Sequence, residues 1–159
     1  MSGAEVTEKV VITYGTFDLF HVGHLKLLQR LSQMGDKLIV GISTDEFNLS
    51  KGKRCIIPYE QRAEIVQNIK QVDLVIPERS WDQKSNDIRE HNVDIFAMGS
   101  DWRGKFDDLN ELCSVVYLER TEGISTSELK ELLSSIDKDK INNLKKALEM
   151  VLIVAEEFR

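Results

Sequence analysis

The sequence predicts an α/β fold: a mainly parallel five-stranded sheet flanked by helices, with a further helix at the C-terminal end. Short runs that are apolar and rich in β-branched residues alternate with segments of helical periodicity, which is the pattern of successive βα units. The chain has 159 residues, and a domain of this length buries enough surface to be stable without disulfides or a structural metal. One core of ordinary size is therefore expected.

Five runs are expected to form the strands. Each is short and apolar at almost every position, as strands are when helices cover both faces of a parallel sheet. The runs are residues 10–14, 38–43, 74–76, 94–98 and 115–118, and residues 1–9 precede them as an N-terminal extension.

Three helices are expected between these strands. The first spans residues 22–34, ends at Gly35 as a C-terminal cap, and has apolar positions at Leu25, Leu27, Leu28 and Leu31. The second begins near Pro58 and ends before Gln71, and the third spans residues 83–91. Residues 48–58 are basic and contain glycine, which predicts a loop able to close over a ligand.

The C-terminal part of the chain predicts more helix. Ser125 and Glu128 form a capping-box pattern, so a helix is expected to begin at Thr126. We expect the main α/β domain to span residues 10–133 and a helical extension to span residues 134–159, with an apolar face made of Ile141, Leu144, Leu148, Val151, Leu152 and Ala155. This face needs a partner surface, and three remain open: the chain's own domain, a second copy, or a larger assembly.

Composition excludes several classes of function. The formal net charge of −6 argues against a general nucleic-acid binder, which needs a net basic face. No apolar run approaches the roughly 18 residues of a membrane span, and the N-terminus lacks the apolar core of a secretory signal. Cys55 and Cys113 form no CxxC pair, so two reduced thiols are expected. Together these features predict a cytoplasmic protein.

The segment HVGH carries the strongest chemical signal. It follows the first predicted strand and opens the leucine-rich helix, and at such a junction backbone N–H groups are available to an anion. His21 and His24 are three residues apart on one helix face, and Gly23 between them lets a phosphate approach. Gly15 and Thr16 belong to the preceding turn. Imidazole donors placed in this way suit phosphoryl or nucleotidyl transfer.

Two other interpretations of the histidine pair remain. The rings could serve only to cap the helix, or they could bind zinc, although only the distant His91 is available as a third histidine. Asp18, in the same segment, could order the loop or lie near a metal. The glycine patterns GxGxxG and GxxxxGK[ST] of other nucleotide-binding sites are absent.

Local basic clusters stand out against the acidic total. Lys51 and Lys53 flank Gly52 and can both face a polyphosphate. Arg62 and Lys70 lie eight residues apart on the second predicted helix, where they share a face that suits the phosphate of a second substrate or is simply a charged surface.

Two further motifs follow predicted strands. RTEGIST, residues 120–126, places Arg120 before a glycine-containing loop and a helix N-terminus, which is another prepared anion site. MGSDW, residues 98–102, offers the carboxylate of Asp101 and the ring of Trp102 to a ribose or base, although the ring could equally be a packing residue.

These motifs resemble the cytidylyltransferase family of the HxGH nucleotidyltransferase superfamily, in particular its members that act on glycerol 3-phosphate. The resemblance runs from residue 10 to about residue 132 and includes YGTFDLFHVGH, GDKLIVGISTDEFN, the KGK loop, YEQR, MGSDWRGKFD and YLERTEGIST. It implies a Rossmann-like nucleotidyltransferase fold and transfer of CMP from CTP to glycerol 3-phosphate, which yields CDP-glycerol and pyrophosphate. It also implies Mg²⁺ on the triphosphate and use of the product in teichoic-acid or other surface-polymer synthesis. The expected partners are these substrates and a second copy of the chain, with no nucleic acid and no membrane.

The resemblance also assigns residues to roles. The catalytic residues are His21, His24, Lys51 and Arg120. The CTP-binding residues are Gly15, Thr16, Phe17, Gly23, Lys53, Asp101, Thr121, Ser125 and Thr126. The acceptor-binding residues are Asp18, Arg62, Lys70, Trp81 and Lys84. No protein ligand to a metal is expected, since Mg²⁺ would be held through the phosphates of CTP.

Four departures from the family pattern bear on the acceptor. Lys70 stands where similar enzymes often carry arginine, Val22 replaces a bulkier aromatic residue, residues 55–58 differ from the usual polar loop, and the tail from Asp137 has no counterpart. Three alternatives therefore stay open: another phosphorylated or phosphonate alcohol as acceptor, adenylyl transfer, or a nucleotide-binding module without turnover.

Overall fold

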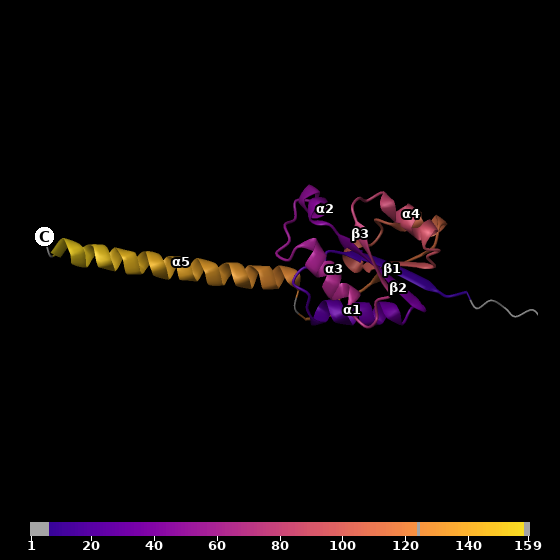
Figure 1. Ribbon diagram of the computed structural model, residues 1–159, viewed down its shortest axis with the longest axis horizontal. Helices are drawn as coiled ribbons and strands as arrows, with labels where there is room; N and C mark the ends of the chain where they lie inside the picture. The colour runs from indigo at the N-terminus through magenta and orange to yellow at the C-terminus, as the bar shows by residue number, and fades with distance from the viewer. Residues whose placement is uncertain (1–6, 124, 158–159) are drawn as a thin grey trace, which may run out of the picture. The chain divides into compact units, whose positions relative to one another are not determined.

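The fold is a single parallel sheet covered on both faces (Figure 1). The computed structural model describes residues 7–123 and 125–157. The strands lie in the order β3-β2-β1-β4-β5, and all neighbours are parallel. Their bounds are β1 (Val10–Gly15), β2 (Lys37–Ser43), β3 (Leu74–Glu78), β4 (Ile95–Gly99) and β5 (Ser114–Leu118). The predicted fold class and all five predicted strands are confirmed.

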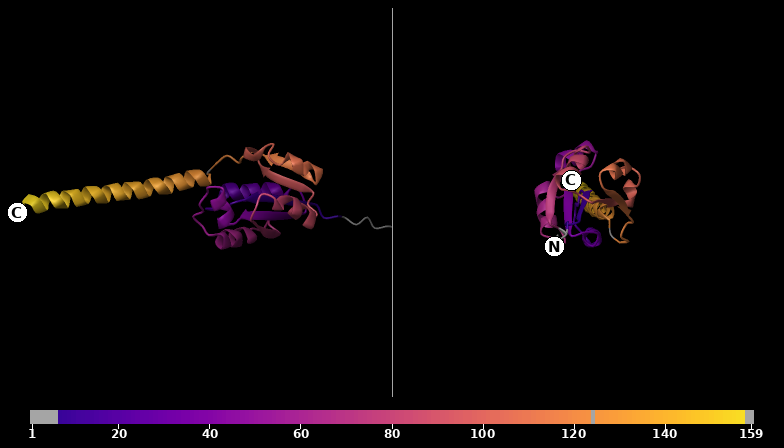
Figure 2. Two further views of the ribbon diagram at one scale, coloured as in Figure 1. Left: turned by 90° about the horizontal axis from the view of Figure 1, so that it is seen from above. Right: turned by 90° about the vertical axis from the view of Figure 1, so that its right-hand side faces the viewer.

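Helices and short helical turns cover the two faces of the sheet (Figure 2). Leu28 and Val66 bring α1 (Val22–Ser32) and α3 (Tyr59–Gln67) onto one face, where they join a buried cluster with Val11. Ile88 and Leu109 bring α4 (Gln83–Glu90) and the 3₁₀ turn η2 (Asp107–Glu111) onto the other face. Because both faces are buried, the strands are apolar at nearly every position, as the sequence pattern indicated.

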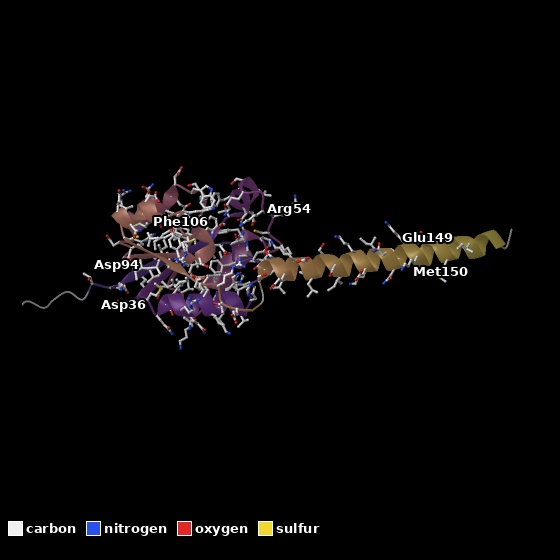
Figure 3. All side chains as sticks on the ribbon, turned by 180° about the vertical axis from the view of Figure 1, so that it is seen from behind. Asp36, Arg54, Asp94, Phe106, Glu149 and Met150 are labelled. Atoms are coloured by element: carbon white, nitrogen blue, oxygen red, sulfur yellow. The ribbon has the colours of Figure 1, made fainter. Side chains whose placement is uncertain are left out.

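Three aspartates lock the starts of neighbouring strands together. Each stands one residue before a strand and accepts a hydrogen bond from a backbone N–H at the start of the neighbouring strand. The pairs are Asp36 with Lys9 at 2.8 Å, Asp73 with Leu38 at 2.7 Å and Asp94 with Val10 at 2.8 Å. Figure 3 labels Asp36 and Asp94 at this edge. The opposite edge, where the strands end, is left for the functional loops.

The ends of two predicted helices are wrong. Helix α1 ends at Ser32 with Gln33 as its cap, so Gly35 is not the cap. A Cβ at Gly35 would lie 2.6 Å from the carbonyl oxygen of Lys9, which explains the glycine by close packing. Helix α3 ends at Gln67, and Lys70 is exposed beyond it while Arg62 is buried within it. The prediction that Arg62 and Lys70 share one helix face is therefore wrong.

Three short elements were not predicted. The first is α2 (Asp45–Ser50), which occupies the start of the expected loop over residues 48–58. Thr44 caps it by accepting a hydrogen bond from the N–H of Phe47 at 3.2 Å. The others are η2 and the 3₁₀ turn η1 (Ser100–Trp102), and neither is long enough to show periodicity. Among the described residues, neither Cys55 nor Cys113 forms a disulfide.

The C-terminal helix α5 (Thr126–Glu157) is continuous. The two helical stretches expected before residue 133 and after Asp137 therefore form one helix. The predicted capping box is confirmed: Ser125 N–H donates to Glu128 at 2.8 Å, and Glu128 N–H donates to Ser125 Oγ at 3.1 Å. The chain divides into two compact units, Met1–Gly123 and Ile124–Arg159, and each is described by itself.

Apolar side chains along α5 are exposed, among them Ile141, Leu144, Leu148 and Val151. Side chains project from all round this helix, including Glu149 and Met150 near its C-terminal end (Figure 3). In the described part of the chain, no helix combines the length and the apolar character needed to cross a membrane.

Candidate active site

The strand order places a ligand crevice beside β1. The chain leaves β1 for β2 on one side, whereas β4 pairs with β1 on the other side, so the strand order reverses between β1 and β4. In open parallel sheets, ligands bind at such a switch point, beyond the carboxyl ends of the strands. HVGH follows β1 and the MGSDW motif ends β4, so the two motifs meet at this crevice.

His21 and His24 hold each other at the start of α1. His21 is the N-cap, and its Nδ1 accepts a hydrogen bond from the N–H of Gly23 at 3.0 Å. Nδ1 of His24 accepts from the N–H of His21 at 3.2 Å, which completes a capping box made of histidines. The two rings stack with their centroids 3.9 Å apart. The helix-capping interpretation is thus correct, and Nδ1 is the nitrogen of each ring that makes the cap.

These hydrogen bonds assign the protons of the two rings. Because each Nδ1 accepts a hydrogen bond, Nε2 carries the proton in the neutral ring. Burial, and after it the neighbouring His21, lower the pKa of His24 from 6.5 to about 4, although Asp18 acts in the opposite direction. Burial also lowers the pKa of His21. At neutral pH both rings are therefore uncharged, with Nε2–H as the donor.

The segment before HVGH has a strained backbone. Phe17 and Leu19 have φ values of 53° and 50°, a region that residues with a side chain seldom adopt. The ring of Phe17 is buried, 5.4 Å from the His24 ring between centroids, rather than open to a nucleotide. A Cβ at Gly15 would lie 2.8 Å from this ring, so glycine is needed there. The segment therefore packs against the ring of His24 through Phe17.

Asp18 holds this strained segment in place. Its buried carboxylate accepts hydrogen bonds from the N–H groups of Leu19 at 3.1 Å, Ile56 at 2.8 Å and Ile57 at 2.9 Å. It therefore joins the histidine segment to the chain that follows the two lysines. This geometry corresponds to the loop-ordering role, and the acceptor contact that the resemblance implied stays a prediction.

Arg62 is also committed to the protein itself. Its side chain is buried, and its guanidinium donates to the carbonyl oxygens of Ile57 at 2.9 Å, Thr16 at 2.6 Å and Ser43 at 2.9 Å. It also pairs with Asp45 at 2.7 Å. Arg62 therefore connects the carboxyl ends of β1 and β2, and its guanidinium donors are engaged by protein oxygens.

The two lysines of the KGK loop differ in their surroundings. Lys51 is half-buried at the end of α2, where its Nζ donates to Ser43 Oγ at 3.2 Å. The same Nζ lies 4.1 Å from the ring centre of Phe47 and 5.3 Å from that of Trp81. Burial lowers the pKa of Lys51. Lys53 is exposed.

Asn48 links the turn after β1 to the lysine loop, and sequence reasoning missed it. It is fully buried, and its Oδ1 accepts from the hydroxyl of Thr16 at 3.1 Å. Its Nδ2 donates to the carbonyl oxygen of Ser43 at 3.4 Å and to Cys55 Sγ at 3.1 Å. The capping pattern of α2 was the signal that could have located it.

Trp81 and Lys84 lie together at a cavity of about 490 Å³. Trp102 and Lys105 also line it; the Trp81 and Trp102 rings are 5.5 Å apart between centroids, and Lys105 Nζ lies 5.1 Å from the Trp102 ring centre. Lys84 is buried and forms an ion pair with Glu78. Glu78 ends β3, and its position at the carboxyl end of a parallel strand is the signal that could have identified it.

The remaining predicted residues lie after β4, after β5 or at α5. Arg120 and Asp101 form an exposed ion pair at 2.9 Å, so two predicted site residues meet. The hydroxyl oxygen of Thr121 is buried and has no hydrogen-bond partner among the described residues. Ser125 and Thr126 belong to the second compact unit, where Ser125 caps α5. Within residues 7–123 and 125–157, no group of three or more His, Cys, Asp or Glu could hold a metal ion.

Comparison with known proteins shows the family of this chain. Residues 12–135 match the family described as Cytidylyltransferase-like. A relative from Bacillus subtilis (strain 168), named glycerol-3-phosphate cytidylyltransferase, is 59% identical over 128 residues, which cover 80% of this chain and 99% of the relative. A relative of the same name from Staphylococcus aureus is 54% identical over 129 residues, which cover 81% of this chain and 98% of the relative.

One solved structure shows the shared fold. The lipopolysaccharide core biosynthesis protein from Thermoplasma volcanium GSS1 aligns with a TM-score of 0.62 at 24% identity, covering 72% of this chain and 99% of that one. This likeness and the five-stranded parallel sheet confirm the predicted Rossmann-like fold. The chain belongs to the cytidylyltransferase-like family, in the group of the glycerol-3-phosphate cytidylyltransferases.

Proposed function

We propose that this chain transfers CMP from CTP to glycerol 3-phosphate and releases pyrophosphate, with CDP-glycerol as the product. The observation that carries the proposal is the stacked pair of neutral histidines at the switch point of the sheet. The names of the two bacterial relatives support the choice of substrates.

The reaction is a direct in-line displacement. A phosphate oxygen of glycerol 3-phosphate attacks the α-phosphorus of CTP, and a new phosphorus–oxygen bond forms. The bond from the α-phosphorus to the oxygen that bridges to the β-phosphorus breaks, and its electron pair leaves with pyrophosphate. Because the attacking oxygen is already deprotonated, the reaction needs no general base and no covalent intermediate. Catalysis then consists of positioning and of stabilising developing charge.

The histidines supply that stabilisation. Their Nε2–H groups donate to non-bridging oxygens of the α-phosphate, where charge develops in the transition state. Lys51 and Arg120 neutralise the triphosphate, and the buried hydroxyl of Thr121 is an available donor. Mg²⁺ held through the phosphates of CTP would add charge neutralisation. Asp18 would not be needed as a ligand, and its carboxylate accepts hydrogen bonds from backbone N–H groups.

The acceptor site lies at the aromatic cavity. Trp81 and Lys84 line it, and Lys51 Nζ lies 5.3 Å from the Trp81 ring centre. An ammonium group beside an aromatic wall suits a phosphate carried on a short polyol, because the phosphate meets charge and the carbon chain meets the ring.

Incubation with single substrate pairs tests the proposal. The protein is mixed with Mg²⁺, one nucleoside triphosphate and one phosphorylated or phosphonate alcohol, and pyrophosphate release is followed. We expect release only with CTP and glycerol 3-phosphate. Release with a different pair would show that the proposed acceptor or base is wrong. If no pair gives release, the chain is better described as a binding module without turnover.

We also propose that the chain acts in the cytoplasm as a homodimer and that α5 contributes to the dimer. Exposed Ile141, Leu144, Leu148 and Val151 recur at alternating spacings of three and four residues, which is the spacing of a helix-pairing seam. A second copy of the chain brings the same seam, so it is a matched partner.

Light scattering tests the dimer. Leu144→Glu/Leu148→Glu is expected to lower the measured mass to that of one chain, because charge in the seam opposes pairing. Asn142→Glu/Asn143→Glu adds the same charge to exposed neighbouring positions and should leave the mass unchanged. An unchanged mass in the leucine variant would exclude α5 from the contact.

A further inference from the structure

Glu78 is a buried carboxylate that the reaction described above does not use. It ends β3 and is 3% exposed. One carboxylate oxygen forms an ion pair with Lys84 Nζ, and the other accepts a hydrogen bond from the hydroxyl of Ser43 at 2.5 Å. A carboxylate is buried in this way only when it is paired and hydrogen-bonded, so its contacts define its role.

The contact with Ser43 extends to the second lysine. Ser43 Oγ donates its hydrogen to Glu78 and accepts a hydrogen bond from Lys51 Nζ at 3.2 Å. Glu78 thus holds Lys84 directly and Lys51 through one hydroxyl. The ammonium groups of Lys84 and Lys51 lie 4.9 Å and 5.3 Å from the ring centre of Trp81.

Lysine needs such an anchor more than arginine does. Its ammonium is a point charge on a flexible four-carbon stem, so its position is set by what it contacts. The rings around Lys84, including Tyr14 at 4.5 Å, attract a cation but do not fix its direction. A carboxylate at the end of a strand is a rigid reference for both lysines.

We propose that Glu78 is the positioning residue of the acceptor site, where it fixes the ammonium groups of Lys84 and Lys51 around Trp81 so that the acceptor phosphate is aligned for attack. The inference rests on the proposed function, because it gives Lys84 the acceptor phosphate as its ligand and keeps Lys51 at the triphosphate that this phosphate attacks. Ser43 connects Glu78 to Lys51 in this arrangement.

Glu78→Gln separates positioning from charge balance. The amide keeps the shape but loses the ion pair, so kcat with CTP and glycerol 3-phosphate should fall by about 100-fold, as for a misplaced substrate group. If the Glu78 carboxylate only balanced the charge of the lysines, it would oppose binding of the acceptor anion. The variant would then show a lower KM for glycerol 3-phosphate with an unchanged kcat. That result would overturn the proposal, as would an unchanged kcat and KM.

Two further variants extend the test, and Glu78→Asp also serves if Glu78→Gln fails to fold. Glu78→Asp keeps the charge and should recover at least about tenfold of the lost kcat, because charge-assisted contacts can re-form. Ser43→Ala breaks only the branch to Lys51, and combined with Glu78→Gln it should add no further loss of kcat. Losses that multiply would show that Glu78 does not act through Ser43. Melting temperatures are compared with those of Glu90→Gln, an exposed control on α4.

The pH profile is a readout that a merely structural role would not move. Burial lowers the pKa of Lys51, Glu78 raises it, Lys53 and Lys84 lower it, and Cys55 raises it. In Glu78→Gln the alkaline limb of kcat/KM should therefore shift to lower pH, and an unshifted limb counts against the proposal. Wild-type turnover tests the proposed function by itself, so an active wild type with a fully active, folded Glu78→Gln overturns only the positioning role.

Discussion

Replacing His24 by asparagine separates the two roles that the structure gives to its ring. Nδ1 accepts the hydrogen bond from the N–H of His21, and Nε2 carries the proton that can be donated to phosphate. An asparagine Oδ1 can take the place of Nδ1, so the helix start is kept while the Nε2 donor is lost. His24→Ala removes both groups.

The expected magnitudes follow from these contacts. Loss of one transition-state donor lowers kcat by about 100- to 1,000-fold, which corresponds to roughly 2.7–4 kcal/mol. His24→Asn and His24→Ala should both show this loss. Loss of the cap costs a further ~1 kcal/mol of unfolding free energy, and only His24→Ala should show it.

Pyrophosphate release with CTP and glycerol 3-phosphate gives kcat, and urea denaturation gives the unfolding free energy. His91→Asn is the matched control, because this histidine caps the far end of α4. If His24→Asn keeps its rate to within about threefold of wild type, Nε2 is not the donor at the α-phosphate and the assigned role is wrong.

Three further results are expected. Asp18→Ala should lower the unfolding free energy by about 3 kcal/mol and lower the activity, because the N–H groups of Ile56 and Ile57 lose a charged acceptor. Full stability in urea denaturation would contradict this. The pKa of His24 is lowered from 6.5 to about 4 in the folded chain, so the unfolded chain binds more protons between these values. Stability should therefore be complete above pH 6.5 and fall towards pH 4, and this fall should be smaller in His24→Asn. Arg62→Lys should cost about 3 kcal/mol, since buried partners lose a planar donor, whereas exposed Lys70→Ala should stay within about 0.5 kcal/mol in the same denaturation assay.

The histidine pair shows how far sequence reasoning reached. Its place after the first strand followed from a short apolar run and a leucine-rich helix, both of which are local patterns. Its internal geometry did not follow, because Nδ1 of each ring bonds to the backbone of the same turn and only the three-dimensional structure shows which nitrogen is used. The lowered pKa of His24 likewise depends on burial, which a sequence does not state.

Asp18 and Arg62 show what sequence reasoning did not reach. The resemblance assigned both to the acceptor, and the structure adds that both are buried and bonded to the protein. Whether a charge meets a ligand or a backbone group depends on loops that are distant in sequence. The contact from Asp18 to Ile56 spans 38 residues, and that from Arg62 to Thr16 spans 46.

The sequence by itself determined the five parallel strands, the position of HVGH and the start of α5 at its capping box, because each depends on periodicity or on contacts within a few residues. Only the tertiary structure decided the strand order, the neutral state of the histidines and the link from Lys84 through Glu78 and Ser43 to Lys51. These features join segments that come into contact only when the strands pair and the helices pack onto the two faces of the sheet. The buried groups in these segments form hydrogen bonds with one another, and burial changes their pKa values. No local sequence pattern encodes either effect.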